Sequence, residues 1–202
     1  MKNKKIISSI SFIAIAFICI LGMNGFINKN KEKQEVSYLK ASWGYNYSDI
    51  QEISTASDLI AMIRVNKLIS NSKENVIPFS TFEVQVIDPI YGCEDGETFP
   101  IIMTGLQNDK EKIEIIDDPM LEVGQKFLVF TRKNEDGTYK ILSGPQGRLE
   151  YKDGELNSLQ FVNSNVRENN KDMNIKIKNV KAETLTNEIK DNIKENKHKH
   201  NK

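Results

Sequence analysis

The chain has 202 residues, of which 39% are hydrophobic and 28% charged, and its 28 basic and 28 acidic side chains give a formal net charge of zero. This length and composition predict one globular domain with extensions. A neutral chain has no overall field that draws it to nucleic acid, so we expect no nucleic-acid partner. The cysteines are Cys19, inside an apolar run, and Cys93, so we expect no disulfide within the folded domain.

The first 28 residues have the pattern of an export signal. Three lysines lie within the first five residues, and a charge-free run follows at residues 6–27. This order predicts an N-terminus left in the cytoplasm and a chain sent across the membrane. The run is long enough for a transmembrane helix, and the large residues two positions before Gly22 and Gly25 disfavour cleavage there. We therefore expect a membrane anchor with the domain outside the cytoplasm; a cleaved signal peptide, giving a secreted protein, is the alternative.

A polar, lysine-rich segment follows the apolar run, and we assign residues 29–47 to a tether and a strap. The main domain is then expected at residues 48–162. At its start, Ser48 and Gln51 have the spacing of a capping box, and Ile50 with Ile53 forms a narrow apolar stripe. The pattern predicts a short helix that ends near residue 57.

Two segments alternate apolar and polar residues with a period of two, which predicts half-buried strands. The first, residues 58–65, has Leu59, Ala61, Ile63 and Val65 on one face, and the second, residues 81–88, has Phe82, Val84 and Val86. Residues 97–104 are a third candidate. Pro100 lies inside it and has no N–H to donate, so we expect an edge strand or a bulge there.

Further strands are expected beyond residue 118. Pro119 and Gly124 precede residues 125–133, which are apolar on both faces and predict a central strand. Asp-Gly pairs at residues 136–137 and 153–154 separate short alternating segments, which is a strong signal for hairpins. Several short strands joined in this way predict a meandering antiparallel sheet that closes into a small barrel.

The C-terminal part has a different pattern. Residues 163–196 begin as a polar loop and end with apolar residues at helical spacing, namely Ala182, Leu185, Ile189 and Ile193. This spacing predicts one amphipathic C-terminal helix after the barrel. We expect residues 197–202 to form a solvated, disordered tail.

The order of "SDLIAMIRV", "STFEVQVIDPIYG", "DPMLEVGQKFLVF", "SGPQGRLEYKDGEL" and a closing helix resembles a group of small exported proteins of Gram-positive bacteria. Their pattern is similar to netrin-like domains and tissue inhibitors of metalloproteinases. The resemblance covers roughly residues 48–193 and implies an OB-type barrel flanked by helices. The expected fold class is thus β-rich (all-β or α+β): a small antiparallel OB-like barrel with a short helix before it and an amphipathic helix after it, plus an N-terminal transmembrane helix.

The same resemblance raises the possibility of protease inhibition. Those inhibitors open their domain with a disulfide-bonded cysteine that chelates the zinc of the protease. No cysteine opens the domain of this chain. Inhibition by that route is therefore not implied, and inhibition of an extracellular protease is kept as an alternative function.

The residues that usually carry catalysis are sparse. The only histidines are His198 and His200, in the expected tail, so the domain has no imidazole for a general base or a zinc site. Cys93 has acidic residues around it, which predicts a raised thiol pKa and a plain loop cysteine. The acidic loop also lacks the alternating oxygen ligands of a calcium loop. We expect no metal and no cofactor.

A carboxylate-dependent hydrolase is the remaining enzymatic alternative. Asp117, Asp118 and Glu122 form the nearest acidic cluster. They lie beside Pro119 and Gly124, where turn formation already accounts for acidic residues. We therefore expect a protein that is not an enzyme.

Two surfaces are candidates for binding. The first holds Trp43, Tyr45 and Tyr47, whose rings either pack on the barrel as a strap or stack on a sugar or protein partner. The second is a loop rich in glycine and proline that we expect to expose Gln146 and Arg148. The expected function is a membrane-tethered, non-catalytic binding module of the cell envelope. Its partner would be an envelope protein or a wall polymer.

Overall fold

The computed structural model describes residues 34–73, 77–159 and 175–200. The chain divides into two compact units, Met1–Gln34 and Glu35–Lys202, and the fold below is that of the second. The predicted N-terminal transmembrane helix, at residues 6–27, lies outside the described residues. So does most of the predicted polar loop that follows residue 162. Within the described part, no helix is both long and apolar enough to cross a membrane.

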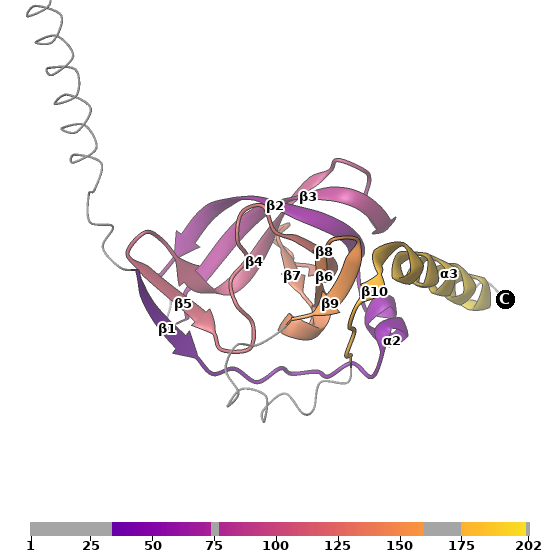
Figure 1. The fold of residues 1–202 in the computed structure, drawn as a ribbon, viewed down its shortest axis with the longest axis horizontal. Helices are drawn as coiled ribbons and strands as arrows, with labels where there is room; N and C mark the ends of the chain where they lie inside the picture. Colours follow the sequence, from indigo (N-terminus) through magenta and orange to yellow (C-terminus); the bar gives the residue numbers. More distant parts are fainter. Residues whose placement is uncertain (1–33, 74–76, 160–174, 201–202) are drawn as a thin grey trace, which may run out of the picture. The chain divides into compact units, whose positions relative to one another are not determined.

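The centre of the domain is a closed barrel of five strands (Figure 1). These strands are β2 (Leu59–Ser72), β3 (Phe79–Tyr91), β4 (Thr98–Gln107), β6 (Lys126–Lys133) and β7 (Tyr139–Ile141). Each pairs with the next in the order β2, β3, β4, β7, β6 and back to β2. The predicted β-rich barrel with one helix before it and one after it is confirmed.

One expected feature of the barrel is wrong, because the sheet is not antiparallel throughout. β4 and β7 pair in parallel, at Ile101 and Tyr139. A closed ring of five strands cannot alternate direction at every step, so at least one neighbouring pair must be parallel. Closure of the barrel therefore requires a parallel pair of strands, which the succession of hairpins along the chain did not predict.

Further strands extend the sheet on both sides of the barrel. β5 (Glu111–Ile115) continues it beyond β4, and β1 (Glu35–Leu39) pairs with β5 in parallel. On the other side, β8 (Arg148–Lys152), β9 (Glu155–Ser158) and β10 (Val180–Lys181) follow β6. β1 lies within the segment assigned to a tether and strap. It is largely exposed, and only its pairing with a strand far along the chain makes it a strand.

β2 is buried more deeply than its alternation predicted. Leu59, Ala61 and Ile63 lie in the barrel interior, as expected. Ile60 and Met62, on the other face, are also buried, because they pack in a second cluster with residues of both helices. The prediction of a half-buried strand is therefore wrong for the first part of β2. It holds for β3, where buried and partly buried residues alternate.

The two helices lie together on one side of the barrel (Figure 1). They are α2 (Ile50–Thr55) and α3 (Ala182–His200). Leu185 and Ile189 of α3 are buried in the second cluster, with Ala182 and Ile193 packed beside them, which confirms the predicted apolar face. α3 extends to His200, and so into the residues 197–202 that were expected to form a disordered tail.

The cap of α2 is displaced by one residue from the predicted box. Asp49, not Ser48, is the N-cap, and its side chain accepts a 2.8 Å hydrogen bond from the Glu52 N–H. The Glu52 carboxylate in turn accepts from the Ser48 N–H at 2.7 Å. Ionised carboxylates make stronger acceptors for backbone N–H groups than the Ser48 hydroxyl and the Gln51 amide would. This preference explains the shift.

Pro100 lies inside β4, which is neither an edge strand nor bulged at this position. The Val86 N–H donates to the Glu97 carbonyl and the Gly105 N–H donates to the Pro78 carbonyl, both at 2.8 Å, so the odd-numbered residues of β4 direct their backbone groups to β3. Pro100 is even-numbered and directs its nitrogen away from β3. The missing N–H therefore removes no hydrogen bond from the β3–β4 ladder.

The Asp-Gly turns are where they were predicted. Asp153 and Gly154 have φ angles of 52° and 87°, and they join β8 to β9. Two positive φ angles in succession match the two-residue turn that fits the twist of a hairpin. Gly137, with φ of 85°, likewise lies between β6 and β7.

Candidate functional site

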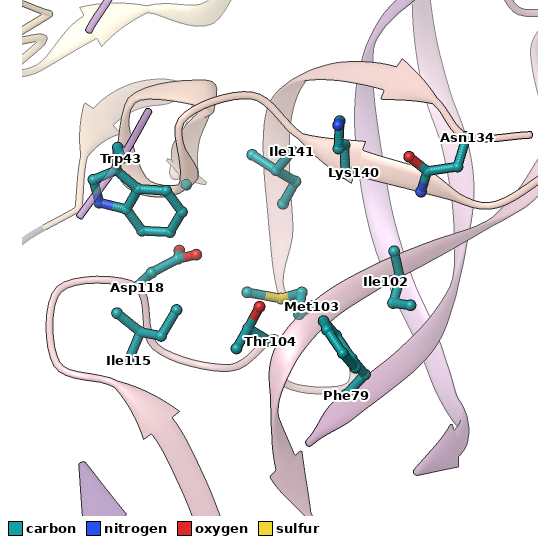
Figure 2. A pocket seen from close by; sticks show the side chains of 11 residues that line it. Trp43, Phe79, Ile102, Met103, Thr104, Ile115, Asp118, Asn134, Lys140 and Ile141 are labelled. Carbon is teal, nitrogen blue, oxygen red and sulfur yellow. The ribbon is translucent and has the colours of Figure 1, made fainter. Parts of the chain in front are cut away.

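A pocket of about 330 Å³ opens in the barrel wall between β4 and β7. Ile102, Met103 and Thr104 of β4 line one side of it, and Lys140 and Ile141 of β7 line the other (Figure 2). Figure 2 also shows that Trp43 and Asp118 form one end of the pocket, whereas Asn134, in the β6–β7 turn, lies at the other. The volume falls at the lower end of the range for small-molecule sites.

The pocket exists because the barrel is only just closed at this seam. Ile101 with Tyr139 is the single pair that joins β4 to β7. The next residue of β4 that pairs with a strand on the side away from β3 is Gly105, which pairs with Glu114 of β5. The edge of β4 from Ile102 to Thr104 thus has no strand partner among the described residues, and the pocket opens beside it.

Trp43 forms a wall of the pocket and also packs against the barrel. Its indole Nε1 donates to a carboxylate oxygen of Asp117 at 3.3 Å. Its ring lies over Gly144, where a Cβ atom would come within 2.3 Å of the indole Cη2. Of the two predicted roles for this ring, packing as a strap is therefore observed. The ring nevertheless reaches the pocket, so the binding role is untested.

The three aromatic residues do not form one binding surface. Tyr45 is 54% exposed, and its hydroxyl hydrogen-bonds the Glu52 side chain. Tyr47 is buried in the cluster under the helices. The prediction of a shared surface with Trp43 is wrong for Tyr47, because Gln146 bonds both of its backbone groups and its ring packs in the cluster under the helices.

Gln146 and Arg148 were expected to be exposed on a loop, and both are buried, at 3% and 1% exposure. The loop is the 3₁₀ turn η1 (Gly144–Gly147). The Gln146 amide holds the strap, since it accepts from the Tyr47 N–H at 3.0 Å and donates to the Tyr47 carbonyl at 3.2 Å. A side chain that satisfies two backbone groups at once is retained inside the fold rather than in solvent.

Arg148 pairs with Asp118 beneath the pocket. A guanidinium nitrogen lies 2.7 Å from the Asp118 carboxylate and also donates to the Pro119 carbonyl. The guanidinium lies 5.4 Å from the centre of the Phe127 ring. Burial raises the pKa of Asp118, the Arg148 charge opposes this rise, and the nearby Asp117 charge adds to it. One side-chain oxygen of Asp117 is buried without a protein partner.

The three carboxylates of the predicted acidic cluster therefore have different partners in the fold. Asp117 and Asp118 are buried and hold Trp43 and Arg148, respectively. Glu122 is exposed and lies 3.5 Å from Lys112, which is closer to Glu114, at 3.0 Å. In these contacts the carboxylates bind side chains of other segments and so hold the loop between β5 and β6 in place. The described residues contain no group of three or more side chains suited to hold a metal ion.

Cys93 lies away from the pocket, after β3. Its thiol is 3.7 Å from the Ile60 carbonyl. Burial raises the thiol pKa, and the Glu97 and Asp88 charges add to the rise. The raised thiol pKa agrees with the prediction, but its leading cause is burial of the thiol rather than the charges of the acidic neighbours.

Lys140 and Asn134 were not singled out from the sequence. Lys140 is exposed and lies across from Arg132 of β6 in the β6–β7 hairpin. The Asn134 amide donates to the Thr138 hydroxyl at 2.9 Å. Their position beside the pocket follows from the closure of the barrel, for which the local sequence contains no signal.

A second hollow, of about 290 Å³, lies between α3 and the barrel. Lys190, which lines it, already pairs with Asp88 at 3.2 Å. Lys126 lies 5.8 Å from the centre of the Tyr151 ring. Because both cations have protein partners, the pocket between β4 and β7 is the stronger candidate site.

No family model, no curated protein and no solved structure matches the chain. The resemblance to netrin-like domains therefore stays a prediction. Function is inferred from the geometry of the pocket and from the sequence.

Proposed function

We propose that this protein is an exported, membrane-tethered, non-catalytic binding module of the cell envelope, and that the pocket between β4 and β7 is its binding site. The observation that carries the proposal is this pocket, where apolar side chains, the Trp43 ring and an unpaired strand edge meet. The export pattern at residues 1–28 supports the location. The partner is an envelope protein or a wall polymer.

The arrangement of the strands supports this choice of site. The five-stranded barrel is consistent with an OB-like fold, with β2, β3, β4, β6 and β7 as its successive strands. OB folds bind ligands on the face of their second and third strands, between the loops that follow the first and the fourth. Phe79 of β3, Ile102 of β4 and Asn134 of the β6–β7 turn all line the pocket.

The chemistry of the pocket supports binding rather than catalysis. Asp118 is the carboxylic acid at the pocket, and it is paired with Arg148. A general acid or base must reach its substrate, whereas the Asp118 carboxylate is buried and one of its oxygens is held by the ion pair. No contact of the described residues specifically favours the two alternatives, a protease inhibitor and a carboxylate-dependent hydrolase.

Photo-crosslinking from the pocket tests the proposed site. A photo-reactive amino acid in place of Lys140, in the full-length chain in cells, should give a discrete crosslinked product. The same substitution at Lys67 should not, because Lys67 is exposed on β2 and does not line the pocket. Equal products at both positions, or none at Lys140, would contradict the site.

Filling the pocket provides the matching loss of function. The Ile102→Trp variant places a larger side chain in the pocket without entering the barrel interior. We expect it to abolish the crosslink, while Ile69→Trp, at a 50% exposed position of β2, leaves it unchanged. A crosslink that survives Ile102→Trp would show that the partner binds elsewhere.

The proposed location has its own test. Val123 is 66% exposed, so a cysteine at this position, in a Cys93→Ser background, is accessible to solvent. A membrane-impermeant maleimide should label Val123→Cys in intact cells. Labelling only after lysis would place the domain on the cytoplasmic side and contradict the export proposal.

A further inference from the structure

We propose that the partner binds as an extended peptide, which adds to the open edge of β4 inside the pocket. This inference rests on the proposed function and names the class of its ligand. It follows from the backbone groups that face the seam between β4 and β7. In strand addition these groups provide affinity, and pockets for side chains provide specificity.

β4 offers part of a hydrogen-bonding edge to the pocket. Its odd-numbered residues direct their backbone groups to β3, as the bonds at Glu97 and Gly105 show from both ends of the strand. Ile102 and Thr104 therefore direct theirs to the seam. The first pair with β7 is Ile101 with Tyr139, and the next, Met103 with Ile141, is not formed. The carbonyl of Ile102 and the N–H of Thr104 are the groups of β4 that this missing pair would have used.

β7 has the complementary arrangement. The Asn134 N–H donates to the Thr138 carbonyl, and the Leu142 N–H donates to the Phe130 carbonyl, at 2.8 and 3.0 Å. The even-numbered residues of β7 therefore direct their backbone groups to β6, and Ile141 directs its own groups to the seam. Both walls of the pocket thus present backbone groups with no strand partner, which is the feature that an extended chain recognises.

The state of Trp43 favours a peptide over a wall saccharide. A sugar would use the flat face and the N–H of an indole, but this N–H already donates to Asp117 and the ring lies on Gly144. What remains available in the pocket is apolar side-chain surface, from Ile102, Ile115 and Ile141. An apolar side chain of a peptide fits this surface while its backbone bonds β4.

The charge beside the pocket indicates a second feature of the peptide. Lys140 is exposed, lines the pocket and forms no ion pair with a described carboxylate. Its cross-strand neighbour Arg132 is engaged elsewhere, because its guanidinium donates to the Ala56 carbonyl at 2.9 Å. An acidic residue next to the apolar one would meet the Lys140 cation. We therefore expect an extended segment that combines an apolar anchor with an acidic neighbour.

The test uses the full-length chain, a displayed library of random eight-residue peptides, and proline as a probe of the β4 edge. Thr104→Pro removes the N–H that faces the seam. Thr104, like Pro100, is an even-numbered residue of β4 whose nitrogen points away from β3, so the substitution removes no hydrogen bond between β3 and β4. Thr104→Val keeps the N–H. Thr98→Pro is the matched control, because Thr98 is an exposed, even-numbered residue of β4 that does not line the pocket.

We expect selected peptides to be rich in an apolar residue next to an acidic one. Thr104→Pro should weaken their binding by about tenfold or more, while Thr98→Pro binds as the wild type does. Thr104→Val, which keeps the N–H, should weaken binding less than Thr104→Pro does. Peptides N-methylated at alternate residues should lose binding in the phase that removes the N–H groups facing β4, and in both phases if the peptide also bonds β7. This second measurement does not depend on how well Thr104→Pro folds.

The remaining outcomes separate the two proposals. Peptide binding that resists Thr104→Pro and both N-methylation phases, yet is lost in Ile102→Trp, would overturn strand addition and leave the pocket as the site. Binding of soluble wall glycan fragments, with no peptide enriched, would also overturn strand addition and leave the pocket as the site. Binding that Ile102→Trp leaves unchanged would overturn the proposed site itself.

Discussion

Arg148 and Asp118 are joined by a 2.7 Å ion pair in which the arginine side chain is 1% exposed and the aspartate side chain 8%. The pair links the start of β8 to the loop that precedes β6, and Asp118 reaches the pocket above it. The end wall of the pocket is therefore held by a buried charge pair. A buried charge that loses its partner is costly, since neither water nor a counter-charge replaces it.

Removal of the arginine should destabilise the domain strongly. We expect Arg148→Met to lower the free energy of unfolding by about 3–5 kcal/mol, because it leaves the Asp118 charge buried and unpaired. Urea unfolding of the full-length chain measures this change. Lys190→Met is the control, as it breaks a partly exposed pair with Asp88 and should cost less than about 1 kcal/mol. Equal losses in the two variants would contradict the account of the buried pair.

Gly144 should be the glycine whose replacement moves Trp43. In Gly144→Ala the new Cβ would meet the indole ring, so the ring must shift. Trp43 is the only tryptophan, so its fluorescence emission reports the shift directly. Gly137→Ala is the control, because it also has a positive φ but open space around the new Cβ. We expect both variants to lose stability, by about 1–2 kcal/mol from backbone strain, and only Gly144→Ala to change the emission.

The Gln146 amide should be needed to hold the strap. Gln146→Leu leaves the N–H and the carbonyl of Tyr47 buried without partners, so we expect a loss of about 2 kcal/mol or more in the free energy of unfolding. Gln85→Leu is the matched change, because Gln85 accepts only an exposed bond from Arg64. It should cost less than about 0.5 kcal/mol. A Gln146→Leu variant as stable as Gln85→Leu would show that the strap is held by other contacts.

Cys93 should react slowly with alkylating reagents at neutral pH. Its raised thiol pKa means a smaller thiolate fraction at any given pH than in a free cysteine. The rate of iodoacetamide modification, followed by peptide mass spectrometry, should still rise at pH values where that of N-acetylcysteine has levelled off. Glu97→Gln removes a charge that raises the pKa and should increase the rate at neutral pH. A rate equal to that of N-acetylcysteine would contradict the burial of the thiol.

Much of the fold was predictable because its signals are local. The Asp-Gly turns at residues 136–137 and 153–154, the inward residues of β3 and the apolar face of α3 depend on neighbours in the chain, and they were predicted correctly. The cap of α2 was displaced by one residue because the Asp49 and Glu52 carboxylates are stronger acceptors for backbone N–H groups than the predicted Ser48 hydroxyl and Gln51 amide. β1 was missed because the partner that makes it a strand, β5, lies far along the chain.

The candidate site was predicted much less well. Trp43 was selected from the sequence and lies at one end of the pocket, and its binding role stays a prediction. Gln146 and Arg148 were expected in solvent and lie in the interior. The pocket, with Ile102, Lys140 and Ile141 along its walls, was not foreseen. It forms where two strands meet at a single pair, and no local pattern encodes how far a barrel closes.

Residue types and their spacing were sufficient to predict the β-rich class, the order of the five barrel strands and their Asp-Gly turns, the flanking helices and the absence of histidine from the barrel. Which polar side chains are buried, and where the wall of the barrel opens, depends on contacts between residues that are far apart in the chain. Gln146 meets Tyr47 across 99 positions of the chain, and Arg148 meets Asp118 across 30. A polar side chain is buried when a distant partner satisfies it, and that partner is fixed only once the barrel has closed.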